Sequence, residues 1–325
     1  MKRKIEASGA PFVGLIDRFV TQGYKPIVST EEAYMKMLNM EGIDGLNIVA
    51  PCDPEFLAWF KKTVKEHNKL VATVTPDTYM DPKLKDGMLV ARDPGMRREA
   101  VETIKQTMDI CADLNGADVL LWQAHDGYSY PFEDDYAQRW DWLLETLDEV
   151  CAHRDDVKVT IEYKCKEPKT RQYISDVGKS LLICEQLKER KNLGIVVDIG
   201  HSLIVDENPA EALALAAHNG KLFHVHLNDN YRSVDDDLMV GAIHFWETLE
   251  FFYEMDMVGY DGWVNLDIWP SYIDGPGALR ESIRRVKMFE NLVEALPREE
   301  IRSLQRKGDL IPIMEILRKT CIKEY

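Results

Sequence analysis

The 325-residue sequence has no long apolar run and no dense set of cysteines. No hydrophobic stretch approaches the about 20 residues that a membrane-spanning helix needs, so we expect no membrane span. The basic N-terminus is not followed by an uninterrupted apolar segment, so we also expect no signal peptide. The six cysteines stand singly and lack CxxC spacing. This pattern argues against a disulfide framework and favours a cytoplasmic protein.

Positive charge is also scarce. Lysine and arginine together number 40 against 56 aspartates and glutamates, which gives a formal net charge of −16. A surface this acidic repels phosphate backbones and anionic lipid, so neither nucleic acid nor a membrane is expected as a partner. The content of 45% hydrophobic and 30% charged residues is typical of a globular protein with a large core.

Short β-type runs alternate with longer segments of helical periodicity through most of the chain. The clearest strands are expected at 45–50, 70–75, 118–124, 157–164, 193–198, 222–228 and 262–268, with a weaker first candidate at 12–19. Amphipathic helices are expected at 31–40, 54–67, 95–115, 135–153, 172–190, 209–219, 244–257 and 277–295. Eight such units in a chain of this length predict a (β/α)₈ TIM barrel rather than an open sheet. Residues 1–296 would form this catalytic domain, and 297–325 a C-terminal helical extension packed on the barrel or on a neighbouring subunit.

Metal-ligand residue types end the last four predicted strands. In a TIM barrel, side chains at these carboxyl ends face the active site. The residues are Glu162, Asp198, His226 and Asp267. A single carboxylate at such a place is more often a helix cap, and a single histidine is more often a hydrogen-bonded core residue. Four together need a compensating positive charge, which a divalent cation provides. Carboxylate and imidazole ligands suit Mn²⁺, Co²⁺ or Mg²⁺ better than a structural Zn²⁺.

An acidic run, Asp235-Asp236-Asp237, follows the seventh predicted strand. By itself such a run is most often a solvated turn. Here it belongs to a loop on the active-site face, within reach of His201. Asp235 and Asp237 could therefore join His201 around a second cation, which leaves one or two ions as alternatives.

These motifs resemble the xylose isomerase-like barrel superfamily, and most closely its pseudomonad-type rhamnose isomerase branch. IEYKCKEP (161–168) resembles the EYK…EP motif of that branch, VDIGH (197–201) its D-x-G-H element, HLND with DDDLMVGAI (226–229 and 235–243) its HFND…DDDLxVGA segment, and Trp122 with AHDGYSYP (124–131) its W…DG…YPG run. The similarity covers roughly residues 118–270, and the first half of the chain shows little of it.

The resemblance implies a role for each matching residue. The four strand-end residues would form a structural metal site, and His201, Asp235 and Asp237 would hold a catalytic metal with Asp198 or Asp267 bridging. An open-chain aldose would bind through two neighbouring oxygens while a hydrogen moves between C1 and C2. Lys164 would polarise the C1 oxygen, although a structural ion pair with Glu162 or Asp198 is an alternative. Trp122 would shield the transfer from water or pack in the core, and Trp269 could line the sugar pocket.

Two histidines fall outside the resemblance. The superfamily often has a ring-opening histidine at the end of strand two, where this chain reads IVAPCDP and has none. His125, at the end of strand four, could supply the missing acid–base group or could hold a structural hydrogen bond. His224 is expected to orient a ligand or to fill a polar layer of the barrel.

Several functions compete on these residues. The leading interpretation is a metal-dependent aldose–ketose isomerase that works by hydride shift on a small sugar, as a homodimer or homotetramer. The alternative is single-metal proton transfer, either by a ketose 3-epimerase, which would place a glutamate where Asp267 stands, or by a C-glycoside-cleaving lyase with His125 as base and a small partner subunit. A zinc endonuclease would need a basic groove, which a charge of −16 opposes. A barrel without activity is disfavoured because every presumptive ligand and Lys164 are present.

Overall fold

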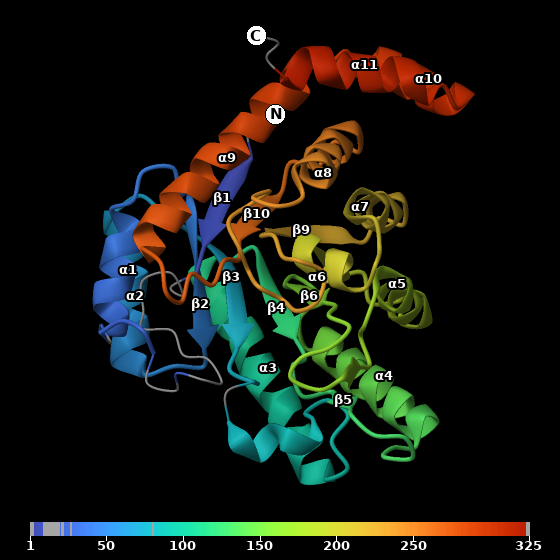
Figure 1. Ribbon diagram of the computed structural model, residues 1–325. Helices are drawn as coiled ribbons and strands as arrows, with labels where there is room; N and C mark the ends of the chain where they lie inside the picture. Colours follow the sequence, from blue (N-terminus) through green and yellow to red (C-terminus); the bar gives the residue numbers. More distant parts are fainter. Residues whose placement is uncertain (1–2, 9–19, 21–22, 27, 80, 323–325) are drawn as a thin grey trace.

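Eight parallel strands close into a barrel in this computed structural model, which describes residues 3–8, 20, 23–26, 28–79 and 81–322 (Figure 1). Around the barrel the strands follow the order β1-β10-β9-β8-β6-β4-β3-β2. Their bounds are β1 Lys4–Ala7, β2 Gly45–Ala50, β3 Leu70–Pro76, β4 Asp118–Trp122, β6 Lys158–Glu162, β8 Leu193–Asp198, β9 Leu222–Leu227 and β10 Trp263–Leu266. The predicted TIM barrel is confirmed.

The first strand lies earlier in the chain than the weak candidate at 12–19, a segment outside the described residues. β1 pairs with β10 from Lys4 opposite Trp263 to Ala7 opposite Leu266, and it also pairs with β2, so it closes the barrel. It has four residues and carries the charged Lys4 and Glu6. So short and polar a run lacks the apolar alternation by which strands are recognised, and the sequence pattern therefore missed it.

Helices surround the barrel as its outer layer (Figure 1). Their bounds are α1 Thr30–Leu38, α2 Pro54–Glu66, α3 Pro94–Leu114, α4 Tyr136–His153, α5 Val177–Gln186, α7 Pro209–His218, α8 Phe245–Met257 and α9 Gly275–Ala295. Side-chain caps begin α1 to α5 and α7: Ser29 accepts a hydrogen bond from the amide of Glu32 at 3.1 Å, for example, and Asp53 accepts one from the amide of Glu55 at 2.8 Å. A short helix, α6 Ile199–Ile204, follows β8 directly.

One predicted helix is shorter than expected. The segment 172–190 contains α5 only from Val177, because Arg171–Gln172 forms a strand, β7, that pairs antiparallel with β5, Gly127–Tyr128. This small sheet joins the loops that follow β4 and β6.

Two further helices, α10 Arg298–Lys307 and α11 Leu310–Cys321, continue beyond α9 and project from one end of the barrel (Figure 1). These helices after α9 confirm the predicted C-terminal helical extension. Within the described residues, no helix is both long enough and apolar enough to cross a membrane.

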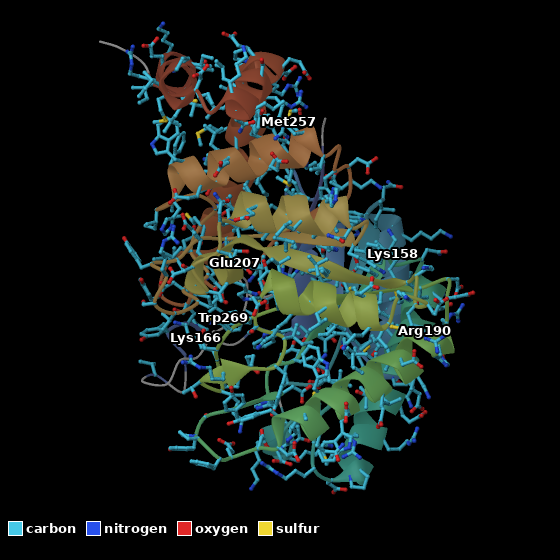
Figure 2. All side chains as sticks on the ribbon, turned by 90° about the vertical axis from the view of Figure 1, so that its right-hand side faces the viewer. Lys158, Lys166, Arg190, Glu207, Met257 and Trp269 are labelled. Atoms are coloured by element: carbon cyan, nitrogen blue, oxygen red, sulfur yellow. The ribbon has the colours of Figure 1, made fainter. Side chains whose placement is uncertain are left out.

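The two ends of the barrel face opposite sides of the molecule in Figure 2. Lys158 and Arg190, at or before the start of a strand, lie on one side, whereas Lys166, Glu207 and Trp269, in loops beyond strand ends, lie on the other. The second side is the face at which a TIM barrel places its active site.

A buried polar layer fills the barrel interior beneath that face. The ring of His224 is fully buried, with Nδ1 2.8 Å from an Asp118 oxygen and Nε2 3.0 Å from a Glu6 oxygen. Thr73 donates a further hydrogen bond to Glu6 at 3.0 Å. Burial by itself lowers the pKa of His224, but the charges of Asp118 and Glu6 outweigh it and raise the pKa to about 9. Of its two predicted roles, His224 takes the one in the polar layer.

This layer gives a stability prediction. Replacing His224 with leucine leaves the buried Glu6 and Asp118 without their shared cation, which should cost about 3–5 kcal/mol. The matched control is His153→Leu, which removes an exposed pair with Asp109 and should cost less than about 1 kcal/mol. Urea unfolding in the presence of EDTA measures both changes. Equal shifts of the two midpoints would contradict the assignment of a buried ion pair.

Candidate metal centre

Four side chains converge at the carboxyl ends of β6, β8, β9 and β10. Each of Glu162, Asp198, His226 and Asp267 offers one ligand atom, and these atoms all lie within 4.8 Å of one another. Nδ1 of His226 is 2.8 Å from Oε1 of Glu162, 3.2 Å from Oδ2 of Asp267 and 3.7 Å from Oδ2 of Asp198. The structure thus brings the whole predicted set together, and we call it the strand-end quartet.

The ladder of the barrel explains this convergence. Asp198 is in register with His226 on the neighbouring strand, and Glu162 is in register with Val196 of β8. Asp198 also caps α6, because its Oδ1 accepts a hydrogen bond from the amide of His201 at 2.8 Å. The amide of Asp267 donates to the carbonyl of Leu227 at 3.2 Å, which continues the pairing of β10 with β9 past the last strand residue.

The quartet fits a divalent cation. Nδ1 of His226 and Oε1 of Glu162 are buried, and although they are 2.8 Å apart neither makes an aligned hydrogen bond. Leaving buried polar atoms without partners costs about 1–3 kcal/mol each. Burial, with the neighbouring Asp235 and Glu162 charges, also raises the pKa of Asp198 to about 6. A cation that accepts oxygen and nitrogen ligands, such as Mn²⁺, Co²⁺ or Mg²⁺, would satisfy the open lone pairs and offset the repulsion.

A buried chain of charges lies beside the quartet. Nζ of Lys164 is 2.8 Å from Oδ2 of Asp235, and Nε2 of His201 is 2.9 Å from the same oxygen. Nδ1 of His201 then lies 3.5 Å from Oε1 of Glu162. Burial alone lowers the pKa of Lys164, but the carboxylates of Asp235 and Asp237 outweigh it and raise the pKa, so this side chain stays protonated. The same balance of burial against carboxylate charges raises the pKa of His201 to about 9.

Lys164 has carboxylate partners that sequence reasoning did not name. Besides Asp235, Oε2 of Glu167 lies 3.4 Å from Nζ, and it also accepts the amide of Asp235 at 3.2 Å. Among the described residues, these are the carboxylates within ion-pair distance of Lys164, rather than Glu162 or Asp198. Glu167 belongs to the EP motif, whose signal was present in the sequence without a role attached to it.

The predicted second cation has only part of its ligand set arranged. His201 and Asp235 are in contact, and Asn228 links Asp237 to Asp198 through its amide nitrogen, at 3.2 Å and 3.0 Å. Burial and repulsion from Asp235 and Asp267 raise the pKa of Asp237 well above its usual value. Within the described residues, however, the strand-end quartet is the cluster with metal-ligand spacing. A second ion would have to share Asp235 with Lys164, and it stays a prediction.

Aromatic side chains lie around this centre. Nζ of Lys164 is 5.2 Å from the ring centroid of Trp122, which in turn contacts the ring of Tyr79 at 5.4 Å. Trp269 is 45% exposed, and its amide donates to the carbonyl of Asp237 at 2.9 Å. Sequence reasoning missed Tyr79, because one aromatic residue after a strand forms no motif.

His125 is not part of the quartet. Its Nε2 lies 3.0 Å from the carbonyl oxygen of Tyr79 and donates to it. This contact matches the structural alternative considered for His125. Its acid–base role stays a prediction.

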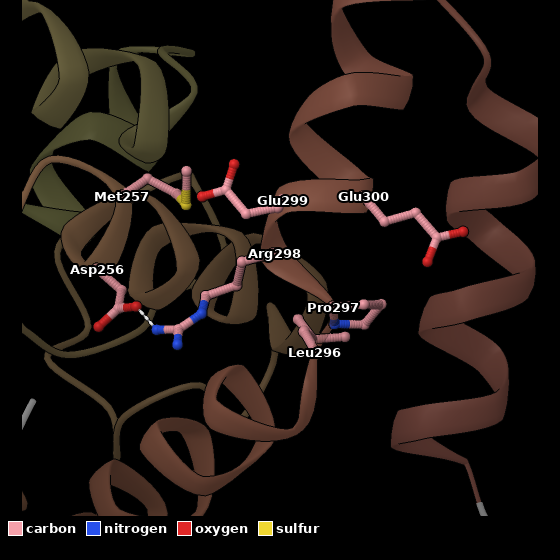
Figure 3. A pocket seen from close by; sticks show the side chains of 7 residues that line it. All are labelled: Asp256, Met257, Leu296, Pro297, Arg298, Glu299 and Glu300. Carbon is pink, nitrogen blue, oxygen red and sulfur yellow. Dashed lines mark hydrogen bonds and ion pairs between the residues drawn. The ribbon is translucent and has the colours of Figure 1, made fainter.

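A separate hollow lies away from the predicted site residues. It is lined by Asp256, Met257 and residues 296–300, between the end of α8 and the start of α10, and Arg298 forms an ion pair with Asp256 within it (Figure 3). In Figure 2 Met257 lies far from Trp269. The hollow contains none of the predicted ligands, so the metal centre is a different place.

Comparison with known proteins now gives the family. Residues 33–289 match the xylose isomerase-like TIM barrel family. The chain belongs to this family. Xylose isomerases of Thermus thermophilus and Thermus caldophilus are 29% and 28% identical to it over 208 residues, which are 62% of this chain and 54% of each relative. The chain therefore spans about half the length of the curated relatives it matches.

Solved structures of other proteins share the fold of this chain. A D-tagatose 3-epimerase-like protein has a TM-score of 0.69 and 20% identity, with 90% of this chain and 98% of that chain covered. The 3-keto-D-glucoside 4-epimerase of E. coli has a TM-score of 0.65 and 18% identity, with 88% and 100% covered. At these identities the likeness shows the fold alone. The predicted superfamily is confirmed, whereas the rhamnose isomerase branch stays a prediction.

The quartet predicts metal dependence that substitution can test. Asp198→Ala should weaken Mn²⁺ binding at least about 100-fold, because it removes a buried anionic ligand. The matched control is Asp176→Ala, since Asp176 caps α5 as Asp198 caps α6 but lies outside the quartet. Both variants lose a cap worth about 1 kcal/mol. Equilibrium dialysis with metal analysis measures the difference, and equal Mn²⁺ content in the two variants would refute the site.

Proposed function

We propose that this protein is a divalent-metal-dependent aldose–ketose isomerase that moves a hydride between C1 and C2 of an open-chain sugar. The observation that carries the proposal is the placement of Lys164. Its buried ammonium lies between Asp235 and the ring of Trp122, next to the strand-end quartet. A fixed cation at this place can stabilise negative charge that develops on a sugar oxygen.

The quartet would hold the cation. A divalent ion held there would supply Lewis acidity toward the oxygens of the substrate. Its donor set suits Mn²⁺, Co²⁺ or Mg²⁺. The resemblance to rhamnose isomerases supports the same arrangement, and its further residues, His201, Asp235 and Asp237, would serve a second ion.

The protein's own side chains would do the rest. Lys164 has three N–H donors, so it can keep Asp235 and still donate one to the carbonyl oxygen of an open-chain sugar. Trp122 and Tyr79 form an apolar wall beside the ammonium, and Trp269 stands at the rim beyond Asp267. Such walls keep water from the migrating hydrogen, which a hydride shift requires.

Single-metal proton transfer is the second candidate. Glu162 and Asp267 both approach Nδ1 of His226, at 2.8 Å and 3.2 Å, so two neighbouring carboxylates are available as acid and base. An epimerase would use such a pair. A lyase would instead use His125, which is tied to the Tyr79 carbonyl. The position of Lys164 favours the isomerase.

Lys164→Met should lower kcat by about 10²–10³-fold with little change in Mn²⁺ affinity, because it removes a donor to the developing charge and no metal ligand. Lys166→Met, two residues on and half-buried, is the matched control and should keep kcat. Steady-state kinetics on the best sugar of a panel of aldoses and ketoses gives both values. Unchanged turnover of Lys164→Met would exclude its role.

Isotope exchange separates the two chemistries. In D₂O with Mn²⁺, a hydride shift should leave little deuterium on C1 or C2 of the product, since the hydrogen never reaches solvent. Proton transfer should introduce close to one deuterium per turnover. Mass spectrometry of the product measures this incorporation. Full incorporation, or no conversion of any free sugar, would refute the isomerase proposal.

A further inference from the structure

Asn265 lies inside the barrel beside the histidine of the quartet. It is buried on β10 and is in register with His226 of β9 on one side and with Glu6 of β1 on the other. Residues paired in this way on parallel strands point to the same face. The amide nitrogen of Asn265 is 3.4 Å from Nε2 of His226. Asn265 therefore meets the ring on the side away from the carboxylates.

The orientation of His226 determines what it needs from this neighbour. Nδ1 faces the oxygens of Glu162 and Asp267, so Nε2 is the nitrogen that faces Asn265. An imidazole that gives the lone pair of Nδ1 to a cation carries its proton on Nε2. That buried N–H then requires an acceptor.

The side-chain carbonyl of Asn265 can accept the Nε2 proton of His226. Its Oδ1 is buried and without a partner, and Oε1 of Glu6 is also buried and without a partner. The two ends of a side-chain amide have nearly the same shape, so hydrogen bonding decides which end faces which neighbour. With the carbonyl turned to His226, Oδ1 accepts the Nε2 proton and the NH₂ group faces the side of Glu6. Both open acceptors then gain a donor nearby.

His224, another polar neighbour of His226, has its own carboxylate partners. The ring of His224 stands edge-on to that of His226 with centroids 5.4 Å apart, but both nitrogens of His224 lie against carboxylates, those of Asp118 and Glu6. It offers Nε2 of His226 no lone pair.

We propose that Asn265 is the positioning residue of the metal centre: its carbonyl accepts the Nε2 proton of His226 and thereby directs Nδ1 at the cation. The opposite amide orientation pairs with the proton on Nδ1, the tautomer that cannot ligate through Nδ1. One amide can therefore serve the metal-free and the metal-bound ring. This role rests on the metal centre of the proposed function, but not on which sugar reaction takes place there.

Two substitutions test this role without measuring turnover. Asn265→Leu removes the acceptor and should weaken Co²⁺ binding about 10–100-fold, the loss typical of removing the partner of a ligand histidine. Asn265→Asp keeps an acceptor oxygen in nearly the same volume. Its affinity for Co²⁺ should therefore stay close to that of the unaltered protein. Competition titration gives the affinities, and visible absorption of Co²⁺ reports its coordination.

The matched control is Thr160→Val. Thr160 is also buried and stands two residues before a quartet carboxylate, but its hydroxyl donates to the carbonyl of Val119 and not to a ligand. It should leave Co²⁺ affinity unchanged. The role is overturned if Asn265→Leu binds Co²⁺ like the unaltered protein, or if Asn265→Asp binds as weakly as Asn265→Leu. Should the unaltered protein bind no Co²⁺, the proposed metal centre itself fails.

A measurement on the unaltered sequence covers the case in which Asn265→Leu does not fold. With ¹⁵N-labelled histidine and Mg²⁺, the long-range ¹H–¹⁵N spectrum distinguishes the two tautomers of His226, assigned by comparison with His226→Gln. A proton on Nε2 that exchanges slowly with solvent is expected. A proton on Nδ1 in the Mg²⁺-loaded protein would overturn the role.

Discussion

Buried negative charge at the carboxyl end of the barrel is the constraint on which the site depends. β6, β8, β9 and β10 each bring a polar strand-end residue to the same place, so the ladder that closes the fold also forces three carboxylates around one imidazole. Burying a carboxylate without compensation costs several kcal/mol. The fold is therefore tolerable only with positive charge at this point, whether from Lys164 and His201 or from a bound cation.

Two polar layers of the same barrel meet this constraint differently. In the lower layer, the ring of His224 lies between Asp118 and Glu6, with one carboxylate beside each of its nitrogens. In the upper layer, His226 faces more carboxylates than it has nitrogens to offer, and its Nδ1 remains without an aligned partner. Both layers keep open atoms, since Oε1 of Glu6 and Oδ1 of Asp118 also lack partners, but the lower layer has one imidazole nitrogen for each carboxylate, whereas three carboxylates approach a single nitrogen in the upper layer. That contrast, rather than the residue types alone, indicates where a metal would bind.

The strand-end quartet could be predicted from sequence because the alternation of a β-strand and the polarity of a TIM barrel determine where Glu162 and His226 must point. Strand β1 could not, since four residues with two charges give no periodic signal. Loop geometry was equally hidden. Asp229 holds the loop that carries Asp235 by accepting hydrogen bonds from the amides of residues 243 and 244, a contact that no spacing rule reveals. The pairing of Lys164 with Asp235 follows from that loop, so the sequence located both residues without joining them.

The shared oxygen of Asp235 decides how much of the site a second cation could use. Oδ2 of Asp235 already receives Lys164 and His201, at 2.8 Å and 2.9 Å. A divalent ion ligated by His201 and Asp235 would compete with the ammonium for the same carboxylate, because two cations at one oxygen repel each other. Lys164 can yield that place if its donors go to Glu167, 3.4 Å away, and to a substrate oxygen. A second ion and a substrate oxygen on Lys164 would therefore favour each other, so the sugar itself would complete the site.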